Sequence, residues 1–197
     1  MTTTARHLSR RGALAVMTGA GLTGLAPTAF AQSYPDRPVK VVVPFAAGGP
    51  TDIMGRVLFQ KVGDNLGKSF FIENVGGAGG NIGMGQVARS APDGYTMLFA
   101  SSTYVVNPSL YSSVPYDAFK DFIPISNVGE STHIFFVHPS LEVKSMKELI
   151  DLIKASPGKY SYASAGSGTV PHLAFELLKL TFKLDISHVP HRGAGPA

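Results

Sequence analysis

Residues 39–52, V-K-V-V-V-P-F-A-A-G-G-P-T-D, decide the fold of this chain of 197 residues. The β-branched run at 39–43 predicts a buried strand, which Pro44 ends. Gly48 and Gly49 then form a loop, and apolar residues recur after it at helical spacing, namely Ile53, Met54, Val57, Leu58 and Val62. A strand therefore delivers a glycine loop to the start of a helix.

The same arrangement recurs along the chain. After the first helix the pattern predicts strands at 70–73 and 96–100, with a glycine loop at 76–81 and a helix at 82–90 between them. A proline-punctuated surface segment at 104–124 follows; beyond it we expect strands at 133–137, 160–163 and 186–189 and helices at 145–154 and across 171–178. The capping box Ser145-Met146-Lys147-Glu148 opens the first of these two helices. This alternation predicts an α/β fold with a largely parallel sheet.

The composition excludes several function classes. Without cysteine the chain has no disulfide, thiolate metal site, iron-sulfur cluster or cysteine nucleophile. Of the 17 basic residues, three lie among residues 1–31, which hold no acidic residue, so that 14 basic residues face 13 acidic ones in the rest. No basic cluster interleaved with aromatic residues remains, and we therefore expect no nucleic-acid partner.

Residues 1–31 are typical of a signal peptide. A basic stretch ending at Arg11 precedes a small apolar run at 12–26 and the A-x-A cleavage site Ala29-Phe30-Ala31. The Arg10-Arg11 pair resembles a twin-arginine export signal, and both that route and the ordinary secretory route stay open. We expect an exported protein that begins at Gln32.

Three loops suit an anion. The loops at 45–52, 76–81 and 164–169 each join a strand to a helix, where glycine allows close approach and the first helical N–H groups lack partners. Parallel strands gather such loops at their carboxyl ends, so residues 48–52 and 164–169 are expected to face one another across a cleft. The alternative is that each loop is only a tight turn.

Single residues leave further alternatives open. Asp52 either complements the positive end of its helix or meets a cationic ligand group. His172 either orients loop hydroxyls or contacts an acid, or it is a surface histidine. The spacing of His188 and His191 favours a structural or hydrogen-bonding role over a metal site, and we predict no metal and no cofactor.

Two motif matches fail on their context. Residues 83–88 fit G-x-G-x-x-A but lie inside a predicted helix, which argues against dinucleotide binding. Residues 165–169 do not complete the G-x-S-x-G motif, and no His/Asp pair is placed to form a triad. We predict that the protein is not an enzyme.

Several ordered motifs carry a family resemblance: Tyr34-Pro35-Asp36-Arg37-Pro38, residues 43–52, Glu73-Asn74, Gly77-Ala78-Gly79-Gly80-Asn81-Ile82-Gly83, residues 91–96, Asn107-Pro108-Ser109-Leu110-Tyr111 and His188-Val189-Pro190. With these motifs the chain resembles the periplasmic solute-binding proteins of tripartite tricarboxylate transporters, the Bug receptors. The resemblance implies an α/β, two-lobed periplasmic binding protein fold of type II, the Venus-flytrap fold. Lobe 1 would span 32–131 and lobe 2 would span 132–197. Family members continue beyond this length, so an incomplete second lobe and poor stability are expected.

The resemblance also implies the ligand site. The first binding loop falls on Phe45, Ala47, Gly48, Gly49, Thr51 and Asp52. The loop of the second lobe falls on Ser164, Ala165, Gly166, Ser167, Gly168, Thr169 and His172. The implied function is a periplasmic receptor, expected to be a monomer, that captures a small carboxylate and delivers it to a membrane permease. The alternatives are a non-functional receptor fragment or an enzyme that uses the same cleft.

Overall fold

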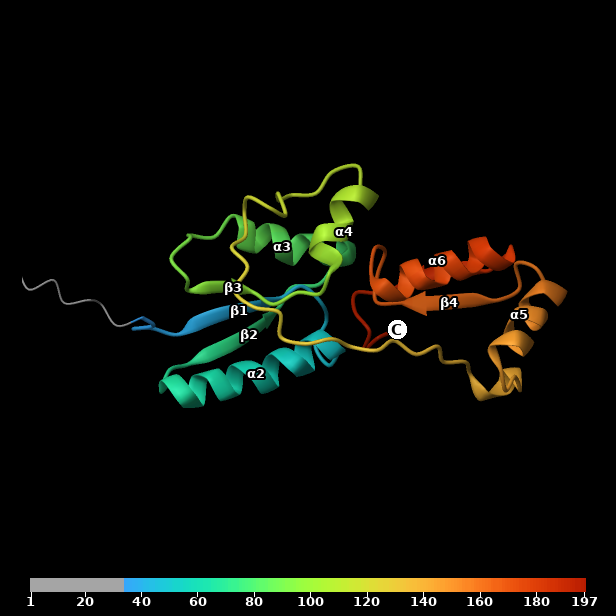
Figure 1. Ribbon diagram of the computed structural model, residues 1–197, viewed down its shortest axis with the longest axis horizontal. Helices are drawn as coiled ribbons and strands as arrows, with labels where there is room; N and C mark the ends of the chain where they lie inside the picture. Colours follow the sequence, from blue (N-terminus) through green and yellow to red (C-terminus); the bar gives the residue numbers. More distant parts are fainter. Residues whose placement is uncertain (1–33) are drawn as a thin grey trace, which may run out of the picture. The chain divides into compact units, whose positions relative to one another are not determined.

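The computed structural model describes residues 34–197, so the predicted signal peptide at 1–31 lies outside the described residues. Residues Pro35–Ala197 form one unit. Within it, a three-stranded sheet and a two-stranded sheet lie on either side of the predicted lobe boundary between residues 131 and 132 (Figure 1). The division into two lobes stays a prediction.

The first sheet is built around β1 (Val39–Val43). Strand β1 lies between β2 (Phe70–Asn74) and β3 (Thr96–Leu98), and both neighbours run parallel to it. Four of its five residues are fully buried, because helices cover both faces of a parallel sheet and leave no face for polar residues. The strand predicted from the β-branched run is confirmed.

Helices α2 (Pro50–Leu66) and α3 (Asn81–Ala88) cover opposite faces of this sheet (Figure 1). Neighbouring positions on a strand point to opposite faces. Ile72 of β2 points to α2, where a Cβ on Gly55 would lie 3.2 Å from its Cδ1 atom. Leu98 of β3 packs instead against the core cluster around Met84 of α3.

Helix α4 (Thr103–Leu110) corrects the prediction of an irregular surface segment at 104–124. It contains Pro108, which the sequence analysis treated as an interruption. The buried Asn107 holds the helix against the rest of the fold, because its amide donates to Gly79 O at 3.0 Å and to Asn81 Oδ1 at 2.7 Å. Such distant contacts outweigh the local preference of proline.

The second sheet pairs β4 (Ser161–Ser164) with β5 (Ser187–Pro190), again in parallel. Helices α5 (Met146–Ala155) and α6 (Val170–Phe182) accompany it. Its core consists of buried residues from α5, from β4 and from the segment between α6 and β5: Leu149, Ile150, Ile153, Tyr162, Leu184 and Ile186. The predicted cap at Ser145 is confirmed, since its Oγ accepts from Glu148 N at 3.2 Å. Glu148 in turn accepts from Lys144 N.

The predicted strand at 133–137 is wrong. These residues pair with no strand in the described part of the chain and run as an irregular segment before the short helix η2 (Pro139–Leu141). Ile134 is 69% exposed and Phe136 is 87% exposed. An apolar run forms a strand only where a neighbour completes its hydrogen bonds, and neither described sheet offers one here.

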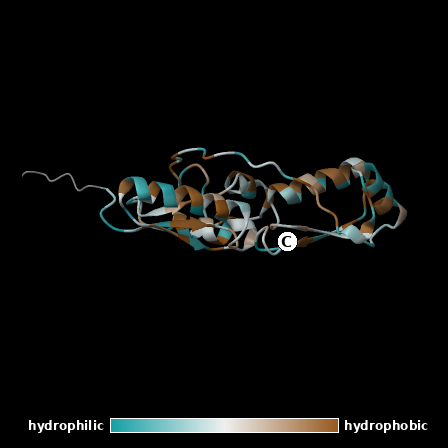
Figure 2. Cartoon of the chain, turned by 90° about the horizontal axis from the view of Figure 1, so that it is seen from below, coloured by the Kyte–Doolittle hydropathy of each residue, from teal (hydrophilic) through white to brown (hydrophobic). Residues whose placement is uncertain are grey.

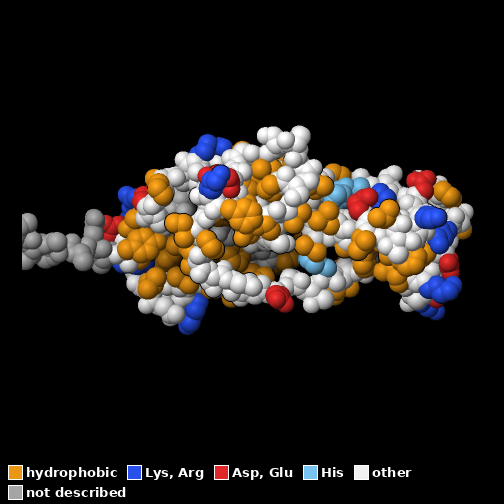
Figure 3. All heavy atoms as spheres, turned by 45° about the horizontal axis from the view of Figure 1, so that its top comes forward, with side chains coloured by type: hydrophobic (Ala, Val, Ile, Leu, Met, Phe, Trp, Pro, Cys, Tyr) orange, Lys and Arg blue, Asp and Glu red, His pale blue; other side chains and the backbone are white. Residues whose placement is uncertain are grey.

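Apolar side chains are also exposed elsewhere. The helices carry hydrophilic and hydrophobic residues in alternation (Figure 2), and orange apolar side chains cover much of the face in Figure 3. Leu177 and Leu180 of α6 belong to this exposed set. No helix among residues 34–197 is long and apolar enough to cross a membrane.

Candidate functional site

The first predicted loop follows β1 directly and ends at the start of α2. Gly48 adopts a φ of +81°, a conformation that favours glycine, and Pro50 stands in the first turn of α2, where its missing N–H costs nothing. Gly49 is buried, whereas Ala47 and Gly48 are exposed and Thr51 is half-buried. Phe45 is buried in the core, and its carbonyl oxygen accepts from Asn74 Nδ2 at 3.1 Å.

Asp52 holds this loop from inside. Its carboxylate is 2% exposed and accepts from Gly48 N, Arg56 Nε and Asn74 Nδ2, each at 2.9 Å. The hydrogen bond from Arg56 is the main cause that lowers the pKa of Asp52 to about 2; the bonds from Gly48 and Asn74 add to it, and burial opposes it. With these partners the carboxylate stabilises the loop and the start of α2, which favours the first of the two roles considered for it.

The second predicted loop follows β4 and ends at the start of α6. Ser164 Oγ lies 2.7 Å from His188 Nε2 and accepts from Gly166 N at 3.2 Å. Gly166 O in turn accepts from Thr169 Oγ1 at 2.6 Å and from Thr169 N at 3.2 Å. Hydroxyl groups thus fix the loop internally, and Ser164, Gly166, Gly168 and Thr169 are all buried.

His172 contacts the second loop from the first turn of α6. Its Nδ1 atom accepts from Gly168 N at 3.2 Å, and its ring stacks on His188 with the centroids 4.3 Å apart. His172 therefore orients the loop through a backbone amide, a role close to the hydroxyl-orienting one considered from the sequence. His188 has a hydrogen-bonding role, as the sequence analysis favoured.

Loops from both sheets meet at the carboxyl ends of their strands. Ala46 N donates to Arg192 O at 3.0 Å, which joins the loops after β1 and β5. In the loop after β2, the short helix η1 (Ala78–Gly80) contacts the second loop, because a Cβ on Gly79 would collide with Ser167 O. Tyr111 Oη also donates to Ser167 O at 3.0 Å. The two predicted binding loops thus belong to one junction of strand ends.

Several backbone N–H groups at this junction are free to donate. Those of Ala47 and Gly49 in the first loop, and of Ala165 and Ser167 in the second, have no hydrogen-bond partner within residues 34–197. Helix α6 has no acidic residue in its first turn, and no side chain caps its N-terminus. Unpartnered N–H groups beside positive helix ends form an environment for a negatively charged group.

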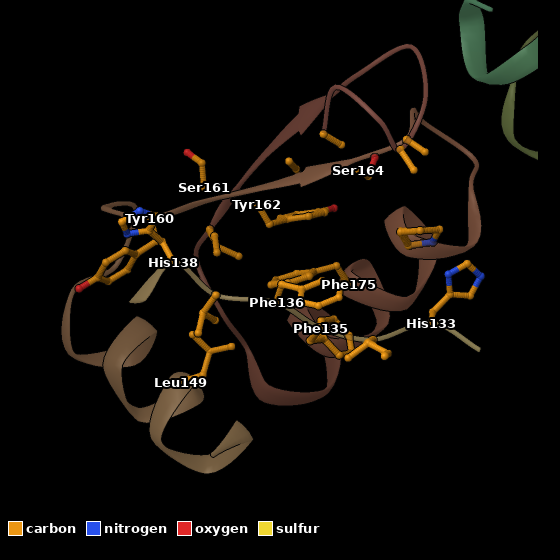
Figure 4. Close-up of a pocket in the computed structure, with 18 of the residues that line it drawn as sticks. His133, Phe135, Phe136, His138, Leu149, Tyr160, Ser161, Tyr162, Ser164 and Phe175 are labelled. Carbon is orange, nitrogen blue, oxygen red and sulfur yellow. The ribbon is translucent and has the colours of Figure 1, made fainter. Parts of the chain in front are cut away.

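A cavity of about 560 Å³ opens beside the junction and reaches it at Pro50, Ser164, Ala165 and Ala194. Figure 4 shows that most of its lining is aromatic or aliphatic, and Phe135, Phe136, Tyr162 and Phe175 lie together in it. The apolar lining suits the hydrocarbon part of a ligand or protein side chains.

Sequence reasoning missed the residues that support the loops. Asn74 and Asn107 occur in motifs that resemble the family, but neither was given a role. Each asparagine forms a hydrogen bond to a residue that is distant in the sequence: Asn74 to Asp52, and Asn107 to Gly79. The sequence shows only that Asn74 directly follows a predicted strand and that Asn107 precedes a proline. These positions do not indicate which residue each asparagine contacts.

Parallel strands that deliver glycine loops and helix N-termini to one junction define the fold of a periplasmic binding protein, here an α/β fold with parallel sheets. The chain belongs to the family described as the tripartite tricarboxylate transporter family receptor, whose model matches residues 54–197. The family resemblance noted in the sequence is therefore confirmed.

Relatives of known sequence or structure agree. The chain is 40% identical to protein BugT of Bordetella pertussis over 176 residues, which is 88% of this chain and 54% of BugT. It is similar to the structure of R. palustris Rpa4515 with adipate, at 33% identity and a TM-score of 0.80, covering 83% of this chain and 55% of that one. MatC from Rhodopseudomonas palustris with bound malate gives 33% identity and a TM-score of 0.76, with 83% and 56% covered. The chain thus spans about half the length of these relatives.

Proposed function

We propose that this chain is the ligand-capturing part of an extracytoplasmic solute-binding receptor that takes up a small carboxylate. The observation that carries the proposal is the set of free N–H groups at Ala47, Gly49, Ala165 and Ser167, where the loops after parallel strands meet. A carboxylate accepts several such hydrogen bonds at once, and the positive end of α6, which has no acidic residue in its first turn, favours its charge.

The thirteen predicted site residues divide between two roles in this proposal. The N–H groups of Ala47, Gly49, Ala165 and Ser167 and the hydroxyl of Thr51 contact the ligand. The remaining residues hold the loops in shape: Phe45, Gly48, Asp52, Ser164, Gly166, Gly168, Thr169 and His172. Relatives with adipate and malate support a dicarboxylate as the ligand class. The apolar cavity beside the loops fits a hydrocarbon chain between two carboxylates better than a compact, highly hydroxylated acid.

The proposal extends to the partner and the location. The receptor would be exported by its signal peptide, act in the periplasm as a monomer of two lobes, and deliver the carboxylate to a tripartite tricarboxylate-type permease. Membership of the receptor family supports this place in transport. A non-functional fragment is the alternative, and the exposed apolar residues favour it.

An enzymatic use of the junction has one observation in its favour. Ser164 Oγ and His188 Nε2 lie 2.7 Å apart, like a nucleophile and its base. Ser164, however, is 2% exposed and is bonded within its own loop, so a substrate carbonyl has no approach to its hydroxyl. We therefore propose binding without turnover.

Calorimetric titration of the protein with adipate and malate tests the proposal. We expect saturable binding of one of them and a loss of at least tenfold in affinity for Ser167→Asp, which places a negative charge beside the free N–H groups. Ser69→Asp is the matched control, because Ser69 is exposed at the opposite, amino end of β2. Equal affinities in the two variants, or no binding of any small carboxylate to the folded protein, would contradict the proposed site.

A further inference from the structure

Five aromatic rings form a continuous stack that ends at the second loop. Phe135 meets Phe175 edge to face at 5.5 Å, and Phe175 lies flat on Tyr162 at 4.0 Å, as Figure 4 shows. Tyr162 stacks on His188 at 4.7 Å, and His188 stacks on His172 at 4.3 Å. Both imidazoles are thereby held by their faces, so their ring nitrogens project from the edge of the stack.

Each imidazole uses a different nitrogen to hold the second loop. His172 Nδ1 accepts from Gly168 N at 3.2 Å, and a backbone N–H can only donate. This nitrogen therefore carries no proton in the described geometry, and the ring is neutral. A proton added to Nδ1 would leave two donors facing one another and would break the contact with the loop.

The contact of His188 also depends on protonation. The single hydroxyl proton of Ser164 has two acceptors within reach, His188 Nε2 at 2.7 Å and Gly166 O at 3.3 Å. The shorter distance favours His188 Nε2 as the acceptor of the hydroxyl proton, as long as Nε2 itself carries no proton. A protonated His188 would donate to Ser164 Oγ instead and turn the hydroxyl proton toward Gly166 O, which already accepts twice from Thr169.

We propose that His172 and His188 are positioning residues for carboxylate capture: as neutral imidazoles they hold Gly168 and Ser164 in the binding geometry. Protonation of His172 breaks its contact with Gly168 N, and protonation of His188 reverses its hydrogen bond with Ser164 and disturbs the bonds to Gly166 O. This inference rests on the proposed function and adds a regulation to the same site. It predicts that acidification weakens binding, although a positive charge near an anion site by itself would strengthen it.

The groups around His188 favour its neutral form. Two residues of β4 contact His188: Tyr162 stacks on one face of the ring, and Ser164 contacts its edge. Three residues of α6 influence the pKa of His188 electrostatically, namely His172, Glu176 and Lys179. Burial is the main cause that lowers the pKa of His188; a proton on His172 and the charge of Lys179 lower it further, and Glu176 raises it. Glu176 is engaged by Lys179 at 2.8 Å and by Tyr162 at 2.6 Å, so its charge is partly balanced.

The direction of the pH effect follows from the lowered pKa. Because the pKa of His188 is lowered by folding, the native state binds fewer protons than the unfolded state below the ordinary histidine value of about 6.5. The stability of the loop contacts is therefore fully present above that value and is lost as the pH falls through the folded pKa. Capture is expected at neutral pH and release in mildly acidic conditions.

The test compares the wild type with variants that keep the hydrogen bonds and cannot titrate. In His172→Asn an amide oxygen takes the place of Nδ1, and in His188→Gln an amide takes the place of Nε2. Affinities for adipate and malate are measured from pH 8 to pH 5. We expect the wild type to lose about tenfold in affinity relative to the double variant if the histidine pKa differs by about one between the free and the bound protein.

Identical profiles in the wild type and the double variant would overturn the proposal. So would a wild-type affinity that rises in acid relative to the double variant, because the imidazoles would then contact the carboxylate directly.

A second measurement needs no ligand and no variant. In the ligand-free wild type, the amide resonances of Gly166 and Gly168 are followed by nitrogen-15 NMR through the same pH range. We expect both to move with the titration of a histidine ring. If neither moves, the positioning role is wrong even where carboxylates bind; if both move but no carboxylate binds, the role in the loop is supported and the proposed function fails.

Discussion

The two candidate binding loops have the same outline but are fixed by opposite chemistry. The first loop closes on the buried charge of Asp52, which three donors hold in its ionised form. The second closes on hydroxyl groups and on two neutral imidazoles. The comparison teaches that a glycine loop alone does not specify a binding geometry. The geometry is specified by the residue that accepts hydrogen bonds from the N–H groups of the loop. The same residue also decides at which pH the geometry is lost.

The largest effect is expected where the charge itself is removed. Asp52→Ala leaves Gly48 N, Arg56 and Asn74 without their acceptor, and loss of a buried, charged partner costs about 3 kcal/mol of unfolding free energy. Chemical denaturation measures this difference. Asp64→Ala is the control, because Asp64 is an exposed residue of the same helix and its loss should change stability by less than about 0.5 kcal/mol. Equal losses in the two variants would mean that Asp52 does not hold the first loop.

The next effect separates the two loops by pH. The pKa of Asp52 is lowered from 3.8 to about 2, so its contribution is fully present above the unfolded value and is lost as the pH falls through the folded one. Since a tenfold change in proton affinity corresponds to about 1.4 kcal/mol, this contribution amounts to about 2 kcal/mol. Denaturation at stepped pH should show this loss below about pH 4, whereas the contribution of His188, whose pKa is lowered by burial, begins to be lost below the ordinary histidine value of about 6.5.

The variant Asp52→Asn assigns that loss to its source. We expect its stability to be lower at neutral pH and to fall by about 2 kcal/mol less than that of the wild type on acidification, since it has no carboxylate to titrate. A drop of unchanged size in Asp52→Asn would place the acid sensitivity in other carboxylates and remove the contrast between the loops.

The parts of this design that are local in sequence were predictable. The strand β1, its glycine loop and the capped start of α5 follow from neighbouring residues, and all three are confirmed. Helix α4 was missed, because its stability comes from the contacts of Asn107 with a loop 28 positions away and overrides the proline within it. The prediction of a strand at 133–137 was wrong, because an apolar run forms a strand only beside a partner strand. The local sequence does not show whether such a partner exists, and neither described sheet offers one.

The candidate site shows the same limit. Its loops could be found from glycine and serine residues after strands, but their supports could not. His188 lies 24 positions from Ser164, and Asn74 lies 22 positions from Asp52. Spacing along the chain carries no information on such pairs, because the register of parallel strands brings them together: Ser164 stands opposite Pro190, two residues beyond His188.

The smallest of these effects tests whether the loops act as one junction. Gly79 has a φ of +63° and contacts Ser167 O so closely that a Cβ would collide with it. Gly67, at the end of α2, has a nearly identical φ of +62° but nothing within 4 Å of its Cβ position. Alanine at either position costs about 1 kcal/mol for the left-handed backbone, and only Gly79→Ala adds the collision with the second loop.

We therefore expect Gly79→Ala to lose about 1 to 2 kcal/mol more stability than Gly67→Ala in chemical denaturation. Carboxylate affinity should fall with Gly79→Ala and stay at the wild-type value with Gly67→Ala, because only the first substitution pushes Ser167 away from the loop after β2. If both variants bind like the wild type while Gly79→Ala alone is destabilised, the contact between the loops supports the fold but not the ligand. In that case the two loops would bind independently, and the different chemistry that fixes each of them would act on separate halves of the site.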